Sequence, residues 1–260
     1  MLALIVRLLA TTGPTIAVLV AAAFVLPADC PFLPRQVLLA AVGIGGIALG
    51  ETLVFRTPVR ELAVRFGFKA TNTTSILTCL AVSLPIWLFL PIATIIGGAP
   101  IQVAGDWPVI VLGVILVNGV AEEVIHRAVF FGRLRERSRF AVAATLGAVL
   151  FGAQHLYLIA TIGVPGIASV GLALFLAYPL CRAFEMGRGS IVGPTILHTS
   201  ANAAFLVFGT AANSGLLMLH MLVVLASVYA VFLVRPPRQA STSARRRDSR
   251  FALILGDQND

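Results

Sequence analysis

Long apolar runs, separated by short polar and basic stretches, dominate the chain. Each run is about 18–24 residues long, enough for a helix to cross the roughly 30 Å of hydrocarbon in a bilayer. The pattern predicts an all-α fold, a polytopic transmembrane helical bundle of about eight spans. The expected spans lie near residues 8–27, 37–55, 74–97, 108–131, 141–160, 164–181, 190–209 and 214–234.

Two segments lie outside these runs. Residues 58–68, PVRELAVRFGF, place apolar side chains at helical spacing with basic residues between them, which predicts an amphipathic helix on the cytoplasmic interface. The segment after Pro237 is polar and basic, a composition typical of disorder and of contact with anionic lipid. We therefore expect a transmembrane domain at 1–235 and a basic cytoplasmic tail at 236–260.

Composition supports a membrane protein. Hydrophobic residues make up 58% of the chain and charged residues 12%, and the mean hydropathy is +0.97. A soluble domain of this size could not bury so much apolar surface. The net charge of +8 does not indicate nucleic-acid binding, because the basic residues occupy short loops between apolar runs. The three cysteines form no CxxC pair, so neither a disulfide framework nor a thiolate metal site is expected.

The distribution of basic residues predicts the orientation. Arginine and lysine cluster in the loops near 56–69, 133–139 and 182–188, whereas the intervening loops hold only Arg35. Cytoplasmic loops carry the excess of positive charge in membrane proteins. We therefore expect a multi-pass protein of the cell membrane with both termini in the cytoplasm.

Ionisable side chains inside the apolar runs are functional candidates, because a charge at membrane depth is costly. The candidates are Glu51, Glu122, Glu123, His126, Arg127, His155, His198 and His220, with Asn118 and Asn202 as polar amides.

Glu122 and Glu123 stand side by side in one expected span. Neighbouring helical residues point about 100° apart, so the two carboxyls are expected to have separate roles. Glu123 and Arg127 have the i, i+4 spacing of an ion pair, which leaves Glu122 to face a cavity about 13 Å from the cytoplasmic end of the span. Alternatively, both glutamates pair with Arg127 and only hold helices together.

Two further runs carry polar groups at a similar expected depth. His155 lies in one, and His198 lies four residues before Asn202 on one face of another. A carboxylate, two imidazoles and an amide are the groups that can activate a water molecule and stabilise an oxyanion.

The order of these residues resembles a known family. Three motifs occur in sequence, each inside an apolar run: EExxxR at Glu122, Glu123 and Arg127; FxxxH at Phe151 and His155; and HxxxN at His198 and Asn202. This arrangement resembles the intramembrane proteases of the CAAX protease and bacteriocin-processing (CPBP, ABI) family, which includes the type II CAAX prenyl endopeptidases. The resemblance places a protease core at about 105–210.

The resemblance implies a mechanism. Glu122 and His155 would activate the water that attacks a peptide carbonyl, and His198 and Asn202 would stabilise the oxyanion. Glu123 and Arg127 would support the site. The motifs leave the cofactor open: Glu122, His155 and His198 could hold Zn²⁺ in a metalloprotease, or the reaction could use no metal.

Some residues depart from the family pattern or fall outside it. His126 stands beside the motif arginine, where it either contacts Glu122 or faces another helix. His220 matches no motif and is expected to be a structural hydrogen-bonding residue. Glu51 is expected to pair with Arg56 or with another basic group.

The expected function is an intramembrane endopeptidase, a hydrolase that cuts a membrane-associated protein or peptide substrate near the cytoplasmic face. The expected partners are this substrate and the lipid bilayer, with no nucleic acid. Two alternatives remain open: a non-proteolytic family member such as an immunity or scaffolding factor, and a proton-coupled transporter that uses the same carboxylates and imidazoles.

Overall fold

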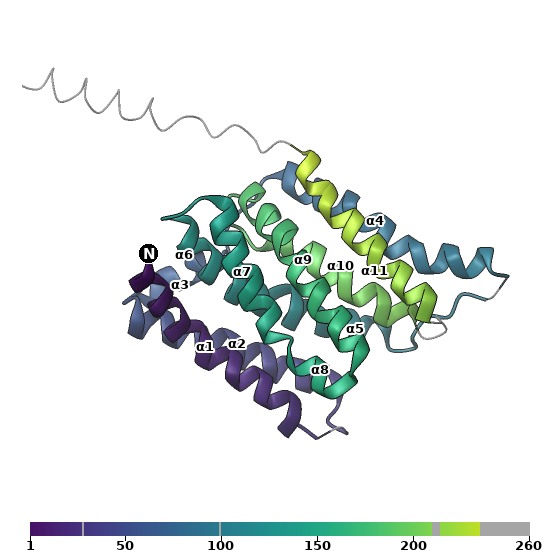
Figure 1. Cartoon of the computed structure of the whole chain (residues 1–260), viewed down its shortest axis with the longest axis horizontal. Coiled ribbons are helices and arrows are strands. Elements are labelled where there is room, and N and C mark those ends of the chain that lie inside the picture. Colours follow the sequence, from purple (N-terminus) through teal and green to yellow (C-terminus); the bar gives the residue numbers. More distant parts are fainter. Residues whose placement is uncertain (28, 99, 210–213, 235–260) are drawn as a thin grey trace, which may run out of the picture.

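The regular structure of this protein is entirely helical. The computed structural model describes residues 1–27, 29–98, 100–209 and 214–234, and this part of the chain contains no strand (Figure 1). The long helices are α1 (Leu2–Val25), α2 (Phe32–Val54), α4 (Thr73–Ile96), α7 (Phe140–Gln154), α9 (Val164–Met186), α10 (Val192–Phe208) and α11 (Ser214–Tyr229). The expected all-α fold is confirmed.

One composite helix runs from Trp107 to Arg135. It joins α5 (Trp107–Val114), the π-helical segments η1 (Ile115–Ala121) and η2 (Val124–Phe131), and α6 (Gly132–Arg135). The short elements are α3 (Val59–Arg65), α8 (Tyr157–Ile162) and the 3-10 turn η4 (Ala230–Leu233).

Seven helices in the described part of the chain are long and apolar enough to cross a membrane. The eighth expected segment, 190–209, does form a helix, but the 17 residues of α10 are short for a crossing. α10 packs against α4, α5, η1 and α9 and buries His198, Thr199 and Ser200. A helix enclosed by protein need not match the thickness of the bilayer, which explains its length. The chain is a multi-pass membrane protein.

The two segments expected outside the spans have different outcomes. Residues 59–65 form the predicted helix, α3, in which Val59 and Val64 are exposed while Leu62 packs against the core. Its position at a membrane interface stays a prediction. The expected tail at 236–260 lies outside the described residues.

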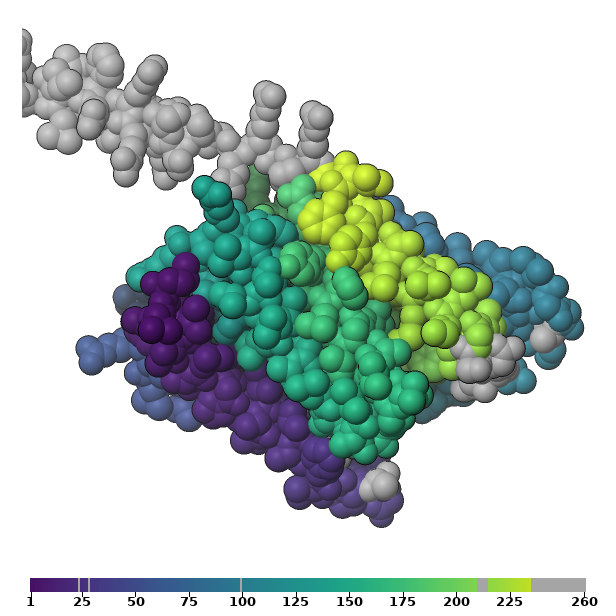
Figure 2. All heavy atoms as spheres, in the orientation of Figure 1, coloured from purple at the N-terminus to yellow at the C-terminus, as the bar shows by residue number. Residues whose placement is uncertain are grey.

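Small residues let the first two helices approach closely. Gly46 and Gly50 of α2 face Thr15 and Thr11 of α1, where an added Cβ would lie 2.6–2.7 Å from the threonine side chains. Such small-xxx-small spacing is typical of helix pairs in membranes. α1, α7, α9 and α11 then lie side by side across one face of the molecule (Figures 1 and 2).

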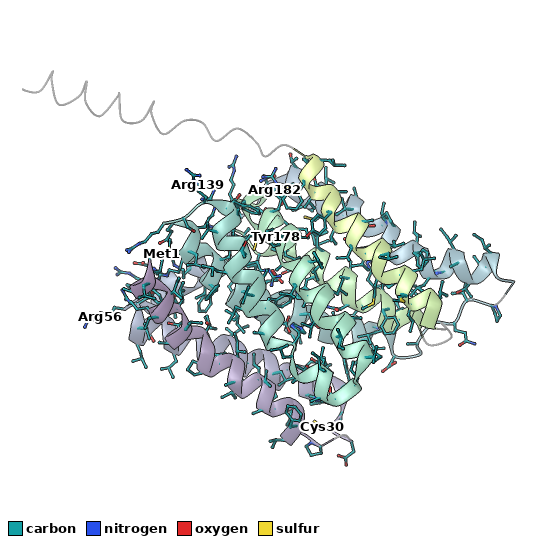
Figure 3. All side chains as sticks on the ribbon, viewed as in Figure 1. Met1, Cys30, Arg56, Arg139, Tyr178 and Arg182 are labelled. Atoms are coloured by element: carbon teal, nitrogen blue, oxygen red, sulfur yellow. The ribbon has the colours of Figure 1, made fainter. Side chains whose placement is uncertain are left out.

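The basic turns gather at one end of the bundle. Figure 3 shows Met1, Arg56, Arg139 and Arg182 along one edge, and Cys30 at the opposite edge. We call the end that carries α3, α6 and the α9–α10 turn the basic end; it also receives the N-terminus of α1. The other end of the bundle carries the α1–α2 turn, α8 and the first residues of α9 and α11.

An ion pair between Glu51 and Arg133 links α2 to the basic end of the bundle. Both carboxylate oxygens of the fully buried Glu51 contact Arg133, at 2.5 and 3.3 Å, and Thr57 donates a hydrogen bond of 2.6 Å to the same carboxylate. Of the two partners expected for Glu51, the structure therefore selects another basic group over Arg56. The Arg133 guanidinium also packs over the Phe55 ring at 4.3 Å.

Candidate active site

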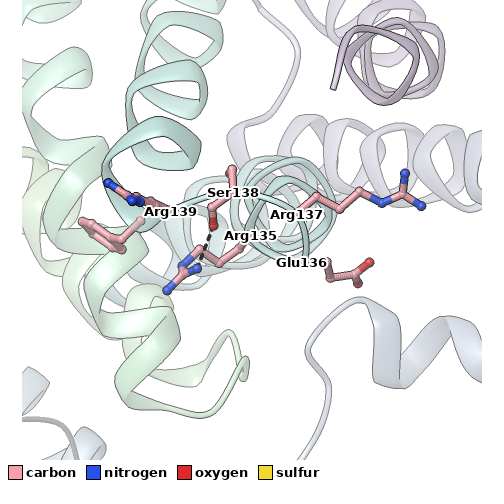
Figure 4. Close-up of a pocket in the computed structure, with 6 residues that line it drawn as sticks. Arg135, Glu136, Arg137, Ser138 and Arg139 are labelled. Carbon is pink, nitrogen blue, oxygen red and sulfur yellow. Dashed lines mark hydrogen bonds between the residues drawn. The ribbon is translucent and has the colours of Figure 1, made fainter.

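A shallow hollow on the basic end is lined by residues 135–140, and Figure 4 shows its charged side chains. Arg135 donates a hydrogen bond to the Ser138 carbonyl at 2.8 Å and contacts Glu185 at 2.5 Å. None of the residues lining this hollow belongs to the three sequence motifs. Charged side chains at a turn are commonly solvated, so the hollow is not the site that the motifs predict.

The two motif glutamates occupy an irregular part of the composite helix. They lie between η1 and η2, so both the turn before Glu122 and the turn after Glu123 are π-helical. π-helical turns within α-helices occur often at functional sites, since they re-aim side chains at the cost of regular hydrogen bonding. The local irregularity therefore coincides with the candidate carboxyls.

Glu123 is enclosed by charged partners. Its Oε2 lies 3.2 Å from Arg127 Nε, and both side chains are buried. This contact lacks hydrogen-bond alignment, because the guanidinium nitrogens have no hydrogen-bond partner among the described residues. Arg127 also packs over the Phe151 ring, 4.4 Å from its centroid. The ion pair and the ring together fix the guanidinium.

Glu123 also orients an imidazole from another helix. Its Oε1 lies 2.6 Å from His198 Nδ1 on α10. A carboxylate oxygen accepts, so His198 Nδ1 carries a proton. The second ring nitrogen, Nε2, is thereby directed toward Glu122, whose Oε2 lies 3.8 Å away.

Glu122 faces a cavity. Its Oε1 accepts long hydrogen bonds from Asn118, at 3.3 Å, and from Gln154, at 3.4 Å. Its Oε2 has no hydrogen-bond partner among the described residues. Glu122 belongs to the lining of a cavity of about 800 Å³, whereas Glu123 and Arg127 do not. The two carboxyls therefore differ in their surroundings: Glu123 is paired and enclosed, and Glu122 lines the cavity and has one oxygen without a hydrogen-bond partner among the described residues.

His155 lies at a break in its helix. The sequence predicts one continuous span at 141–160, but α7 ends at Gln154 and a turn at His155 and Leu156 precedes α8. His155 Nδ1 lies 2.7 Å from the Phe151 carbonyl, which can only accept, so Nδ1 is the donor. In the neutral ring Nε2 then presents its lone pair. His155 lines the cavity that Glu122 lines.

Asn202 lines the same cavity, and its side-chain amide points back along α10. Its Nδ2 donates to the His198 carbonyl at 3.4 Å, near the limit of a hydrogen bond. A group held so weakly can turn toward another acceptor. All four residues expected to be catalytic, Glu122, His155, His198 and Asn202, therefore line one cavity.

A glycine in η1, Gly119, allows α10 to approach the two glutamates closely. A Cβ added to Gly119 would lie 2.5 Å from Thr199 Oγ1, so η1 and α10 can approach this closely only with glycine there. Thr195 adds a hydrogen bond from its hydroxyl to the Gly119 carbonyl. This close contact brings His198 against Glu123.

Gln154 is a site residue that the motif analysis did not single out. Its Oε1 accepts from His126 Nε2 at 2.7 Å, while its Nε2 donates to Glu122 at 3.4 Å. Of the two alternatives for His126, the structure therefore shows contact with another helix, linked to Glu122 only through Gln154. The sequence does contain a signal for Gln154: it is a polar amide directly before His155 in an otherwise apolar run.

The cavity lies in the half of the bundle away from the basic end. Most of its lining residues come from the second half of α1, the start of α2, α8, the first part of α9 and α11, and the second half of α10. Glu122 lies about 20 Å along the composite helix from Arg135 and about 22 Å from Trp107. The carboxyl is thus near the middle of its helix, and its depth in the membrane stays a prediction.

The three candidate metal ligands do not form a metal site. Among the described residues, no group of three histidine, cysteine, aspartate or glutamate side chains is placed to hold a metal ion. The arrangement of Glu122, His155 and His198 therefore does not fit Zn²⁺, and we derive no step through a metal.

Comparison with known protein families confirms the resemblance seen in the motifs. Residues 104–204 match the family described as "Type II CAAX prenyl endopeptidase Rce1-like", a protease family. The matched segment contains all three motifs and every residue of the candidate site discussed above. No curated protein matches the chain.

Proposed function

We propose that the chain, which carries an Rce1-like type II CAAX prenyl endopeptidase domain at residues 104–204, is an intramembrane endopeptidase that uses Glu122 to activate water. One observation carries the proposal. Glu122 is the carboxyl that faces the cavity, with Oε2 unpaired among the described residues and 3.8 Å from His198 Nε2, while Glu123 is paired with Arg127.

The proposed reaction begins with a water molecule between Glu122 and the scissile carbonyl. Glu122 Oε2 takes a proton from the water, and the water oxygen attacks the carbonyl carbon to form a tetrahedral intermediate. His155 Nε2, held by the Phe151 carbonyl at Nδ1, accepts a hydrogen bond from the water and aligns it. Glu122 then returns the proton to the leaving nitrogen, and the C–N bond breaks to give a carboxylic acid and an amine, after which the acid's proton passes to the amine.

The oxyanion needs donors, and α10 supplies them. In the proposed mechanism a proton on His198 Nε2 is donated in a hydrogen bond to the developing oxyanion. Asn202 Nδ2, only weakly bonded to its own helix, is the second donor. Glu123 and Arg127 do not touch the substrate in this proposal; they set the position of His198.

A comparison of cells that express the wild type with cells that express Glu122→Gln tests the activity and finds the substrate. Membrane-protein termini that appear only with the wild type would identify cleavage sites. The proteolytic proposal fails if the two sets of termini are the same at equal protein abundance. A peptide that spans a recovered site then serves as the substrate for purified protein in vesicles.

The side from which substrate enters is a separate prediction. The charge pattern predicts cleavage near the cytoplasmic face, but the cavity is lined from the half of the bundle away from the basic end. We therefore propose entry from the non-cytoplasmic half. Cysteine introduced at Val164, which lines the cavity and is 79% exposed, should react with a membrane-impermeant maleimide in intact cells.

The control for this labelling is Arg137→Cys, on the exposed turn of the basic end. It should react only after the cells are permeabilised. Both variants are made in a Cys30→Ser background, because Cys30 is partly exposed while Cys79 and Cys181 are buried. Labelling of Arg137→Cys, but not of Val164→Cys, in intact cells would place the cavity on the cytoplasmic side.

Metal removal gives another expected result. Since Glu122, His155 and His198 do not form a set of three ligands, a strong zinc chelator should leave the cleavage rate within about two-fold of the untreated protein. A zinc protease treated in the same vesicles checks that the chelator acts. Loss of activity that added Zn²⁺ restores would overturn the metal-free mechanism.

A further inference from the structure

His220 on α11 is a buried imidazole in the wall of the cavity. It is 2% exposed and belongs to the same cavity lining as Glu122. Neither ring nitrogen has a hydrogen-bond partner among the described residues. The ring stacks on Phe89 of α4, with centroids 5.8 Å apart and planes at 28°. The expectation that His220 is a structural hydrogen-bonding residue is therefore wrong for the part of the chain that the structure describes.

An imidazole without hydrogen-bond partners is unfavourable in this buried position. A buried donor and acceptor without partners lose their hydrogen bonds to water and gain none. A phenyl ring would make the same stack on Phe89 without that cost. Packing alone therefore does not explain the histidine, whereas a polar ligand in the cavity would.

The cavity connects this imidazole to the catalytic groups. α10 contacts both η1, which precedes Glu122, and α11, which carries His220. Glu122, His198 and His220 line one continuous space that passes the second half of α10. A peptide bound with its scissile bond at Glu122 can therefore extend along the cavity toward α11.

An extended peptide in this apolar cavity needs hydrogen-bond partners. Backbone groups that leave a helix inside a membrane must be paired again, because lipid offers no replacement for water. Three other polar groups of the lining have partners within the protein: Asn118 donates to Glu122, Asn202 to the His198 carbonyl, and Ser169 to the Pro165 carbonyl. Neither nitrogen of His220 has a partner among the described residues, and a neutral imidazole offers one donor and one acceptor, which matches one peptide group.

We propose that His220 is a substrate-binding residue that pairs with a backbone peptide group of the substrate, several residues from the scissile bond. This inference rests on the proposed proteolytic function. His220 takes no part in bond cleavage, so its contribution appears in substrate affinity and in the choice of substrates that are extended at this point.

The test is His220→Phe in the full-length protein, reconstituted in vesicles with a quenched fluorescent peptide that spans a cleavage site recovered from cells. The variant keeps the ring and removes both hydrogen-bonding atoms. We expect KM to rise about ten-fold, as for loss of one buried hydrogen bond, with kcat within about two-fold. The thermal midpoint should stay the same or rise, because an unpaired buried polar group is gone.

A purely structural role for His220 predicts a different result for the thermal midpoint and for KM. It would lower the thermal midpoint of His220→Phe and leave KM unchanged, and that result would overturn the inference. His220→Gln, which restores a donor and an acceptor, should recover part of the lost affinity. The matched control is Leu222→Phe, on the same helix but 61% exposed and outside the cavity lining, which should change neither KM nor kcat.

Glu122→Gln, measured in parallel, separates the two proposals. If Glu122→Gln is inactive and His220→Phe has a normal KM, only the role of His220 is lost. If Glu122→Gln still cleaves the peptide at the wild-type rate, the proteolytic mechanism itself fails, whatever His220→Phe does.

Discussion

Replacing Glu122 with glutamine should reduce peptide cleavage by about 10³-fold or more, because the amide cannot take a proton from water, and general bases contribute about 10²–10⁴-fold. Glutamine has almost the same shape as glutamate and keeps a carbonyl oxygen for Asn118 and Gln154. The folded structure should therefore survive. The measurement is the initial rate with the quenched peptide, beside the thermal midpoint of the same preparation.

Two control variants test whether the loss of cleavage activity is specific to Glu122. Glu61→Gln removes a carboxylate from α3, where it makes only a 4.0 Å contact with Arg60, and should keep the full rate. Glu123→Gln should also reduce the rate, through misplacement of His198, and in addition lower stability because it breaks the contact with Arg127. Full activity of Glu122→Gln would reassign the base.

Replacing Arg127 with alanine should destabilise the folded protein by about 3–5 kcal/mol, the usual effect of removing one partner from a buried ion pair. Both Glu123 and Arg127 are buried, so Glu123 would keep a charge facing only His198. The guanidinium also fills space over the Phe151 ring, which would face a cavity in the variant. We expect less folded protein in the membrane and a lower thermal midpoint in detergent.

A double variant tests whether the unpaired charge of Glu123 is the reason for the loss of stability in Arg127→Ala. Glu123→Gln with Arg127→Met removes both charges and keeps much of the volume, so it should be more stable than Arg127→Ala alone. It should remain poorly active, because no carboxylate would then orient His198. Arg60→Ala on the exposed surface should change stability by less than about 1 kcal/mol. Normal stability of Arg127→Ala would contradict the role assigned to the buried pair.

The local features of the fold follow from the sequence. Run length and hydropathy predict the helices because a membrane span has a minimum length and an apolar composition that can be read directly. The i, i+4 spacing predicts the contact of Glu123 with Arg127 because both residues belong to one helix. The resemblance to a protease family follows from three short motifs, and the family match at residues 104–204 confirms it.

Contacts between helices could not be predicted in this way. That Glu51 pairs with Arg133, that Gln154 stands between His126 and Glu122, and that α10 is too short for a full crossing all depend on neighbouring helices. Each such contact requires the rotation of a helix about its axis and its shift along a neighbour. These quantities depend on packing, such as the close approach allowed by Gly119, and not on local periodicity.

The candidate site residues and the apolar helices that carry them can be read from the sequence, because apolar runs and motif spacing are local properties of the chain. The tertiary structure separates the two glutamates: Glu123 is enclosed by Arg127 and His198, whereas Glu122 lines the cavity. It also placed His220 in that cavity. The physical reason is that enclosure and accessibility arise from the other helices around a side chain, which no single segment encodes.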